Sequence, residues 1–264
     1  MEYTIDTDRI FYPGKKEVLP LIHITSDFDI LKSIIKDGFK PSYCTEIITN
    51  DIESKSACFP MISFSNVSVE YAINKQRSYG TLGVVLDKNW GEENDLNPVL
   101  YLERKSDLTN EIVRGFTDIR TYSKKDLDDA LQGQRTNHKS LLTKHIIKVF
   151  AHSKNYDGNL IRGGILFSEK YPYGLEREWR KITREDKIPY FLIGDEIENK
   201  SVYNEKLKSI RYDFPLKYLK GLIVESEWEE KEIKKVIMTK YNLSEFPSNI
   251  KIRINSIRHI PDEG

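Results

Sequence analysis

The stretch VLPLIHITSDFDILKSIIKDG, residues 18–38, decides the fold at the start of the chain. Residues 18–25 have the apolar pattern of a short buried strand. Ser26 then has the position of a helix N-cap, and apolar residues recur at helical spacing up to Gly38, which ends the helix. His23 is therefore expected at the end of a strand, just before a turn into a helix, a common place for a polar ligand in such folds.

The rest of the chain alternates between predicted strands and helices. Residues 42–59 read as a polar loop, and Trp90 as part of a turn. Helices are predicted over 67–76 after an Asn66 cap, within 107–156, and after a capping box that begins at Ser226. Strands are predicted at 61–65, 81–86, 98–102, 178–182, 189–193, 221–224 and 251–254. We expect one α+β domain over residues 1–264, with a core at 18–182, a helical insertion at 107–156 and a C-terminal α/β extension at 183–264.

Composition excludes several classes of protein. The 264 residues carry 41 Lys and Arg against 41 Asp and Glu, so the chain has no net charge and is not a polybasic nucleic-acid binder. The two cysteines, Cys44 and Cys58, form no CxxC pair, and the sequence has no HExxH motif, so no metal site is expected. There is no signal-peptide pattern and no apolar stretch that would span a bilayer, which predicts a cytoplasmic protein without membrane contact.

Three polar motifs at predicted strand ends are candidates for chemistry. Each motif alone has an ordinary structural explanation: a core histidine, a polar-faced strand or a salt-bridged edge strand. Two glutamates one residue apart would point the same way on a strand. The candidates are His23 and Thr25; Ser63, Phe64 and Ser65, followed by Tyr71, Arg77 and Tyr79; and Glu176 with Glu178.

A local basic band lies within the predicted helical insertion. No acidic residue occurs between Asp129 and Asp157, and the candidate nucleic-acid contacts there are Arg135, Lys139, Lys144 and Lys148. Such a band can meet phosphates, keep a helix soluble or dock an acidic partner, and the sequence alone does not choose among these. Glycine-rich phosphate loops of the GxGxxG and GxxxxGK[ST] types do not occur.

The order of the motifs resembles the abortive-infection AbiGi family over most of residues 20–182. That family is named for phage-resistance operons of toxin–antitoxin type, in which the AbiGi member has been labelled the antitoxin. The resemblance therefore implies a partner protein from the same operon. It is carried by His23-x-Thr25, the segments 40–46, 60–65, 79–84, 88–90 and 97–101, and the segment 176–180.

The same motifs resemble, more remotely, ADP-ribosyltransferases of the DarT-like type, whose core is a split β-sheet. This likeness implies NAD as a substrate, Glu178 as the catalytic carboxylate and Glu176 as the residue that orients the nucleophile. It also implies that His23, by donating a hydrogen bond, and Thr25 beside it hold a ribose. The implied pocket further contains Ser63, Phe64, Ser65, a stacking ring from Tyr71 or Tyr79, and Arg77 at the pyrophosphate. A second-strand tyrosine is absent, and Ser63 stands in its place.

Three functions follow from these patterns. The first is an NAD-dependent mono-ADP-ribosyltransferase that modifies RNA, DNA or protein in phage defence. The second is a catalytically inactive antitoxin that docks on a partner toxin. The third, a nucleic-acid-binding regulator, lacks a helix-turn-helix pattern. The ordered histidine, serine and glutamate motifs favour the enzyme.

Overall fold

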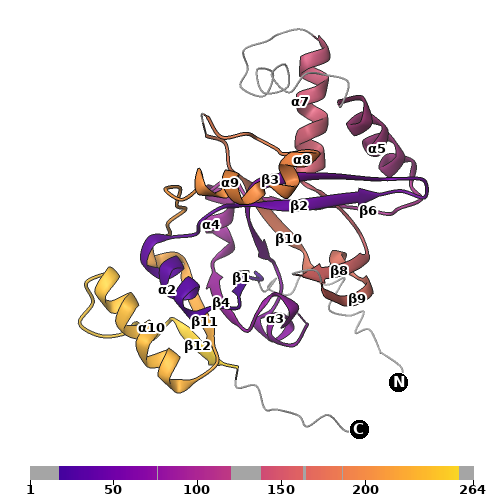
Figure 1. The fold of residues 1–264 in the computed structure, drawn as a ribbon. Coiled ribbons are helices and arrows are strands. Elements are labelled where there is room, and N and C mark those ends of the chain that lie inside the picture. Colours follow the sequence, from indigo (N-terminus) through magenta and orange to yellow (C-terminus); the bar gives the residue numbers. More distant parts are fainter. Residues whose placement is uncertain (1–17, 76, 120–137, 163–164, 186, 256–264) are drawn as a thin grey trace, which may run out of the picture.

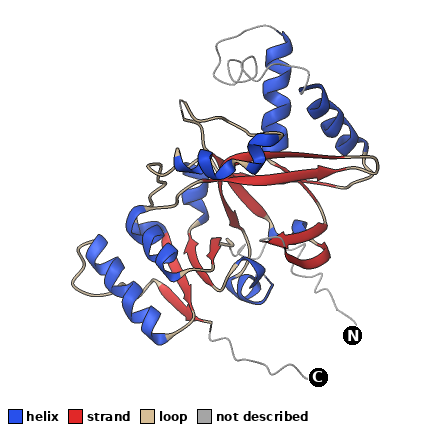
Figure 2. Ribbon diagram, viewed as in Figure 1, coloured by secondary structure: helices blue, strands red, loops and turns tan. Residues whose placement is uncertain are grey.

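A computed structural model describes residues 18–75, 77–119, 138–162, 165–185 and 187–255. Strands of a large sheet run through the middle of the molecule, and helices pack on both sides of it, as Figures 1 and 2 show. The α+β class is thereby confirmed. None of the helices in those ranges has the length and apolar character that crossing a membrane requires. The division into a core and an extension stays a prediction, although both contribute strands to one sheet.

The largest sheet among the described residues has eight strands. Its order is β12–β11–β4–β1–β3–β10–β5, and β2 also pairs with β3. Neighbouring strands are antiparallel, except that β11 and β12 are parallel. The strands are β1 (Leu21–Thr25), β2 (Ser42–Thr49), β3 (Ser54–Ser65), β4 (Leu82–Leu86), β5 (Asn97–Pro98), β10 (Glu178–Ile182), β11 (Leu219–Val224) and β12 (Lys251–Ile254).

Two small sheets lie beside the large one. β6 (Leu100–Leu102) pairs in parallel with β7 (Ser153–Asn155). β8 (Gly158–Arg162) and β9 (Ile165–Tyr171) form an antiparallel hairpin. The hairpin leads directly into η2 (Tyr173–Glu176), a 3-10 turn just before β10.

Helices cover one face of the large sheet and build the main core there. α2 (Phe28–Asp37) and α10 (Glu227–Lys240) pack on each other, and α4 (Lys88–Glu93) adds Trp90 to the same core. The rings of Phe39 and Phe64 lie 4.9 Å apart at its centre. Burial of these rings stabilises the face behind β1 and β3.

Other helices pack elsewhere. α3 (Val69–Lys75) covers the opposite face of β1 and β4. α5 (Asp107–Ile119) and α7 (His138–Ala151) pack on each other and on the β2–β3 hairpin, with the rings of Phe116 and Phe150 stacked at 4.2 Å. The remaining short elements are η1 (Arg77–Tyr79), α8 (Asp195–Glu198), α9 (Lys200–Glu205) and η3 (Leu216–Tyr218).

The start of α2 differs by one residue from the prediction. Asp27, not Ser26, is the N-cap: its carboxylate accepts the backbone N–H groups of Asp29 at 2.7 Å and Ile30 at 3.1 Å. β1 continues through Thr25, so Ser26 is needed for the bend between strand and helix. The cap satisfies two of the N–H groups that a helix leaves unpaired at its beginning.

The rest of α2 agrees with its sequence pattern. Leu31, Ile34 and Ile35 are buried in the main core, as their spacing predicts. Gly38 ends the helix with φ at +93°, and a Cβ there would lie 2.7 Å from the carbonyl oxygen of Tyr212. Only glycine fits both the backbone angle and this close approach.

The cap predicted for α3 is wrong. The side-chain amide of Asn66 donates instead to the carbonyls of Leu19 at 2.7 Å and Pro20 at 3.0 Å. The Ser68 hydroxyl accepts the N–H of Tyr71 at 3.1 Å and serves as the cap. Asn66 follows β3 too closely to face the helix, so it ties that strand to the segment before β1 instead.

The predicted loop at 42–59 is wrong: most of it forms the β2–β3 hairpin, paired from Ser42 opposite Met61 to Thr49 opposite Ser54. Sequence reasoning missed β2 because its inward side carries a charged residue. Glu46 is 8% exposed and pairs with a buried arginine, so the usual alternation of apolar and polar residues is broken.

The predicted strand at 189–193 is also wrong. Leu192 makes one isolated bridge to Cys58, and Tyr190 and Phe191 are buried in the cluster beneath α5 and α7. These residues are apolar because they belong to a buried loop, and not because they form a hydrogen-bonded strand. The predicted strand at 98–102 is divided by Val99 into β5 and β6, which belong to different sheets, and Trp90 lies in α4 rather than in a turn.

Candidate functional site

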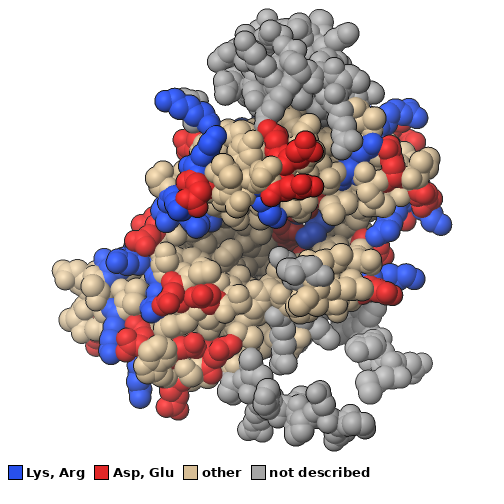
Figure 3. Space-filling model, in the orientation of Figure 1, with Lys and Arg blue, Asp and Glu red and all other residues tan. Residues whose placement is uncertain are grey.

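A cleft of about 800 Å³ opens where two neighbouring strands separate. β1 and β3 pair only at Ile22 opposite Ser65, and Ser65 also pairs with Glu178 of β10. Beyond that point the two strands diverge, and the Nδ1 of His23 donates to the carbonyl of Ser63 at 2.8 Å. Figure 3 shows a hollow in this part of the molecule, below the layer that contains β2.

His23 lies on the core side of β1. Its ring contacts those of Phe39 and Phe64, with centroids 5.2 and 5.5 Å away. Burial lowers the pKa of His23, although the hydrogen bond to Ser63 acts in the other direction, so the ring is neutral at pH 7. Because a carbonyl only accepts, Nδ1 carries the proton and Nε2 keeps a lone pair. In this arrangement Nε2 is left to accept, and the role of His23 toward a ligand stays a prediction.

Arg180 fixes the carboxylate of Glu178. Its Nε lies 2.6 Å from Oε1 and its Nη2 3.0 Å from Oε2 of that carboxylate, and Nη2 is also 2.9 Å from Glu46. Nη1 donates to the carbonyl of Ala151 at 3.0 Å, and Arg180 is fully buried. Burial alone would raise the pKa of Glu178, but Arg180 and Lys154 together lower it to about 2. Glu178 is therefore ionised throughout the physiological pH range.

Lys154 joins the two glutamates of the 176–178 motif. Its ammonium lies 3.1 Å from Glu178 and 3.5 Å from Glu176, and 4.2 Å from the centre of the Tyr173 ring. Burial would lower the pKa of Lys154, but the carboxylates of Glu178, Glu176 and Glu46 raise it above its ordinary value. Lys154 therefore stays protonated in the cleft, beside both carboxylates.

Glu176 does not lie on the same strand as Glu178, contrary to the prediction. It ends the 3-10 turn η2, and Arg177 follows it with φ at +49°, in the left-handed region. Both carboxylates nevertheless lie close to the ammonium of Lys154. Tyr79 donates its hydroxyl to Glu176, which lies 3% exposed, and Tyr171 also bonds to it.

The serine motif is divided between two faces of β3. Ser63 is paired with Arg180 and Ser65 with Glu178, so both serines share the face of the ionic groups. Phe64 points the other way and is buried in the main core, where it supports His23. Ser63, Phe64 and Ser65 all line the cleft.

Two predicted site residues whose side chains the structure describes, Thr25 and Tyr71, are not among those that line the cleft. Thr25 is 7% exposed, and its hydroxyl accepts the N–H of Asp27 at 3.5 Å, in the turn before α2. Tyr71 packs against the cluster around α3, and its pKa is raised by burial and by Glu176. Arg77 belongs to η1, and its side chain lies outside the described part of the chain.

The predicted basic band is mostly outside the described part of the chain, which omits Arg135 and the side chains of Lys139 and Lys144. Lys148 is half-buried in α7, so its role stays a prediction. Lys154, at the end of the same band, points into the cleft and pairs with carboxylates. In this structure its ammonium is paired with Glu176 and Glu178 rather than turned toward the band.

Sequence reasoning missed Glu46, Lys154 and Arg180. Arg180 had a signal, because it stands two residues after Glu178 and therefore shares its face of β10. Glu46 was hidden by its assignment to a loop. Lys154 joins the network only through the parallel pairing of β6 with β7, which no local pattern predicts.

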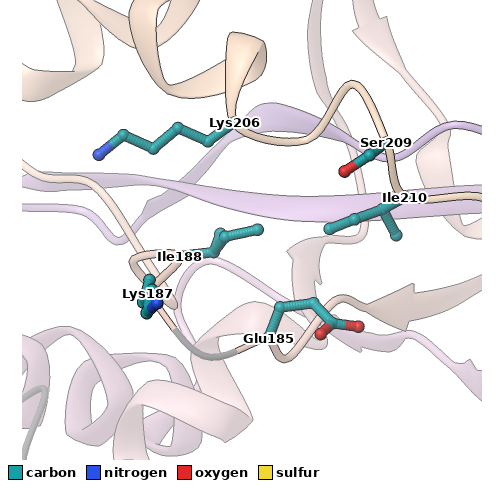
Figure 4. A pocket seen from close by; sticks show the side chains of 6 residues that line it. All are labelled: Glu185, Lys187, Ile188, Lys206, Ser209 and Ile210. Carbon is teal, nitrogen blue, oxygen red and sulfur yellow. The ribbon is translucent and has the colours of Figure 1, made fainter.

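A second pocket, of about 450 Å³, lies elsewhere, and among the described residues it shares none with the cleft (Figure 4). It is lined by Glu185, Lys187, Ile188, Lys206, Ser209 and Ile210, none of which is a candidate site residue. Within the described ranges there is no group of three or more His, Cys, Asp or Glu side chains that would hold a metal ion.

The fold and the cleft define an α+β protein with a polar cleft where two strands of its main sheet separate. Residues 37–225 match the family model described as "Putative abortive phage resistance protein AbiGi, antitoxin". The match covers well over half of the chain, so the chain belongs to the AbiGi family. No curated protein and no solved structure matches the chain. The comparisons therefore give no support to the resemblance to ADP-ribosyltransferases.

Proposed function

We propose that this member of a phage-resistance family binds NAD in the cleft and transfers ADP-ribose to RNA, DNA or protein. One observation carries the proposal. The strands that hold His23, the serine motif and Glu178 are direct neighbours, in the order β1–β3–β10, and all three contribute to the cleft. His23 and Glu178 are far apart in the sequence, and the order of the motifs along the chain does not by itself require that their strands lie next to β3.

The reaction would break the bond between C1′ of the ribose and the nicotinamide nitrogen. Nicotinamide leaves as a neutral molecule with the bonding electron pair, and positive charge develops on the ribose. The carboxylates of Glu178 and Glu176 would stabilise that charge, as carboxylates do in glycoside cleavage. A nucleophile of the acceptor then bonds to C1′, and its proton passes to water.

The surroundings of the two glutamates support different roles for them in this reaction. A carboxyl group with a pKa of about 2 is a poor general base near pH 7, so Glu178 would act as a fixed negative charge rather than as a proton acceptor. Arg180 holds it in one orientation, which preorganises the charge. Glu176 remains the proposed residue for orienting the nucleophile. Nε2 of His23 would accept a ribose hydroxyl, and Arg77 remains the proposed partner of the pyrophosphate.

Two observations favour a second candidate, a binding protein that docks on a toxin. The family description includes the word antitoxin. The β8–β9 hairpin exposes large apolar side chains: Ile161 is 56%, Ile165 64% and Phe167 53% exposed. Contiguous exposed apolar residues often mark a protein–protein interface. In this alternative, the ionic network is purely structural.

The experiment that tests the proposal uses NAD labelled in its adenylate part, with cell RNA, DNA and protein as acceptors. We expect label transfer and equal nicotinamide release by the native chain, and loss of both in Glu178→Gln. Glu230→Gln, which removes a carboxylate from an ion pair on α10, is the matched control and should retain activity. Absence of nicotinamide release from the native chain contradicts the transferase.

The same protein tests the antitoxin alternative. If it protects cells from the product of a neighbouring gene and binds that product, the second candidate is supported. Phe167→Glu on the hairpin should then abolish the complex, whereas Glu178→Gln should leave it intact.

A further inference from the structure

The ammonium of Lys154 occupies a position built for a cation. Carboxylates of Glu176 and Glu178 lie 3.5 and 3.1 Å from Nζ, and the face of Tyr173 lies 4.2 Å from it. A cation over an aromatic ring is attracted by the negative face of the ring, most strongly where water is excluded. Both carboxylates are nearly buried, at 3% and 7% exposure.

The charges around this position favour a cation even without Lys154. Three carboxylates, those of Glu46, Glu176 and Glu178, face two cations, Arg180 and Lys154. The cluster therefore carries one net negative charge with Lys154 in place and two without it. Arg180 is fully buried and held by four bonds, so it cannot leave. The side chain of Lys154 is 17% exposed and reaches the cleft, so it can.

We propose that the ammonium of Lys154 gives up this position to a ligand cation, and that in NAD this cation is the pyridinium ring of nicotinamide, seated against Tyr173. This inference rests on the proposed function for the identity of the ligand. It assigns the ring that faces nicotinamide to Tyr173 rather than to Tyr71 or Tyr79. Tyr71 does not line the cleft, and the ring that the ammonium of Lys154 faces is that of Tyr173.

The exchange of the Lys154 ammonium for the pyridinium ring gives Lys154 a role in each turnover, namely in the release of nicotinamide. Before cleavage, the pyridinium of NAD carries the positive charge that the two carboxylates and Tyr173 attract. After cleavage, nicotinamide is neutral and loses that attraction. Lys154 then competes successfully for the position, which favours release of nicotinamide. Lys154 is a specificity-determining residue in this scheme, because it admits only a group that replaces its charge.

The test measures binding by calorimetry with NAD, NADH, 1-methylnicotinamide and nicotinamide. NADH has the same shape in outline but a neutral ring, and 1-methylnicotinamide is the pyridinium cation alone. We expect the native chain to bind NAD about tenfold or more tightly than NADH, which is the scale of one cation–π contact with a nearby carboxylate. We expect 1-methylnicotinamide to bind more tightly than nicotinamide.

Substitutions at Lys154 and Tyr173 test the competing charge and the aromatic ring independently. Lys154→Met removes the competing charge and should tighten NAD by about tenfold, whereas Lys154→Arg keeps the charge and should not. Tyr173→Leu should reduce the preference for NAD over NADH several-fold, and Tyr173→Phe, which keeps the ring but loses the hydroxyl bond to Asn159, should retain it. The tyrosine variants test the site even if Lys154→Met fails to fold.

Each of the following binding results supports or overturns the inference about Lys154. Equal affinities for NAD and NADH, or an unchanged NAD affinity in folded Lys154→Met, overturn the inference. Binding of 1-methylnicotinamide without binding of NAD supports the cation site and contradicts the proposed function. Binding of NAD with the expected preference but without nicotinamide release likewise supports the site and contradicts the transferase.

Discussion

Replacing Arg180 by methionine should be among the most damaging single changes in this chain. Methionine approximates the length of the side chain but removes the charge that pairs Glu178 with Glu46. Breaking a buried ion pair in this way leaves an uncompensated charge and typically costs about 3–5 kcal/mol. Burial already raises the pKa of Glu46 in the presence of Arg180, so protonation of Glu46 will limit the loss. We expect about 3 kcal/mol at pH 7, a large part of the stability of an ordinary domain.

The assay is urea unfolding followed by circular dichroism at pH 7 and pH 4. The loss should be smaller at pH 4, because protonated carboxyl groups no longer need the guanidinium. Lys234→Met, which breaks a half-buried i,i+4 pair with Glu230 on α10, is the control and should cost below about 1 kcal/mol. The reasoning is refuted if Arg180→Met costs no more than this control at pH 7. A second check is Glu46→Gln combined with Arg180→Met, which should recover part of the loss.

Three further predictions concern stability. The pKa of Glu178 is about 2 in the folded chain, below its ordinary 4.5, so this group stabilises the fold above pH 4.5. That contribution, about 3 kcal/mol, should disappear as the pH falls from 4.5 to 2, and acid unfolding of Glu178→Gln should show a weaker pH dependence. Gly38→Ala should lower the melting temperature, since φ is +93° and Tyr212 is too close, and an unchanged value would contradict this. Asp27→Ala should cost about 1 kcal/mol, as loss of a cap does, while Ser26→Ala should cost little.

Local patterns predicted the elements whose buried side is wholly apolar. In α2, the residues Leu31, Ile34 and Ile35 are buried as their spacing indicates. β4 runs from Leu82 to Leu86 with every residue buried, and its apolar run was sufficient to find it. In such elements the burial of apolar surface alone determines which side faces inward.

Elements next to the cleft were harder to predict, because there the inward side is polar. β2 carries Glu46 toward Arg180, so its pattern resembled a loop. Glu176 looked like a strand residue but lies in a turn, since Arg177 adopts a left-handed conformation that no spacing rule indicates. The motif residues were found because they stand at strand ends. Lys154 was not found as a site residue, because its partners are distant in sequence and the residues around it have the pattern of a basic helix.

The strand register bears on what kind of ligand the cleft would hold. Ile22, Ser65 and Glu178 stand in line across β1, β3 and β10, so the side chain of His23, one residue on, points to the opposite face from Glu178. Yet both residues line one cleft, because β1 and β3 separate directly after that line. A compact ligand would meet only one of these two groups. A ligand that meets both must be elongated and must pass through the split, with a polar part near Nε2 of His23 and another part near the carboxylates. A dinucleotide such as NAD has that form, whereas a single small cation or anion does not, and this is the geometric reason for preferring NAD among polar ligands.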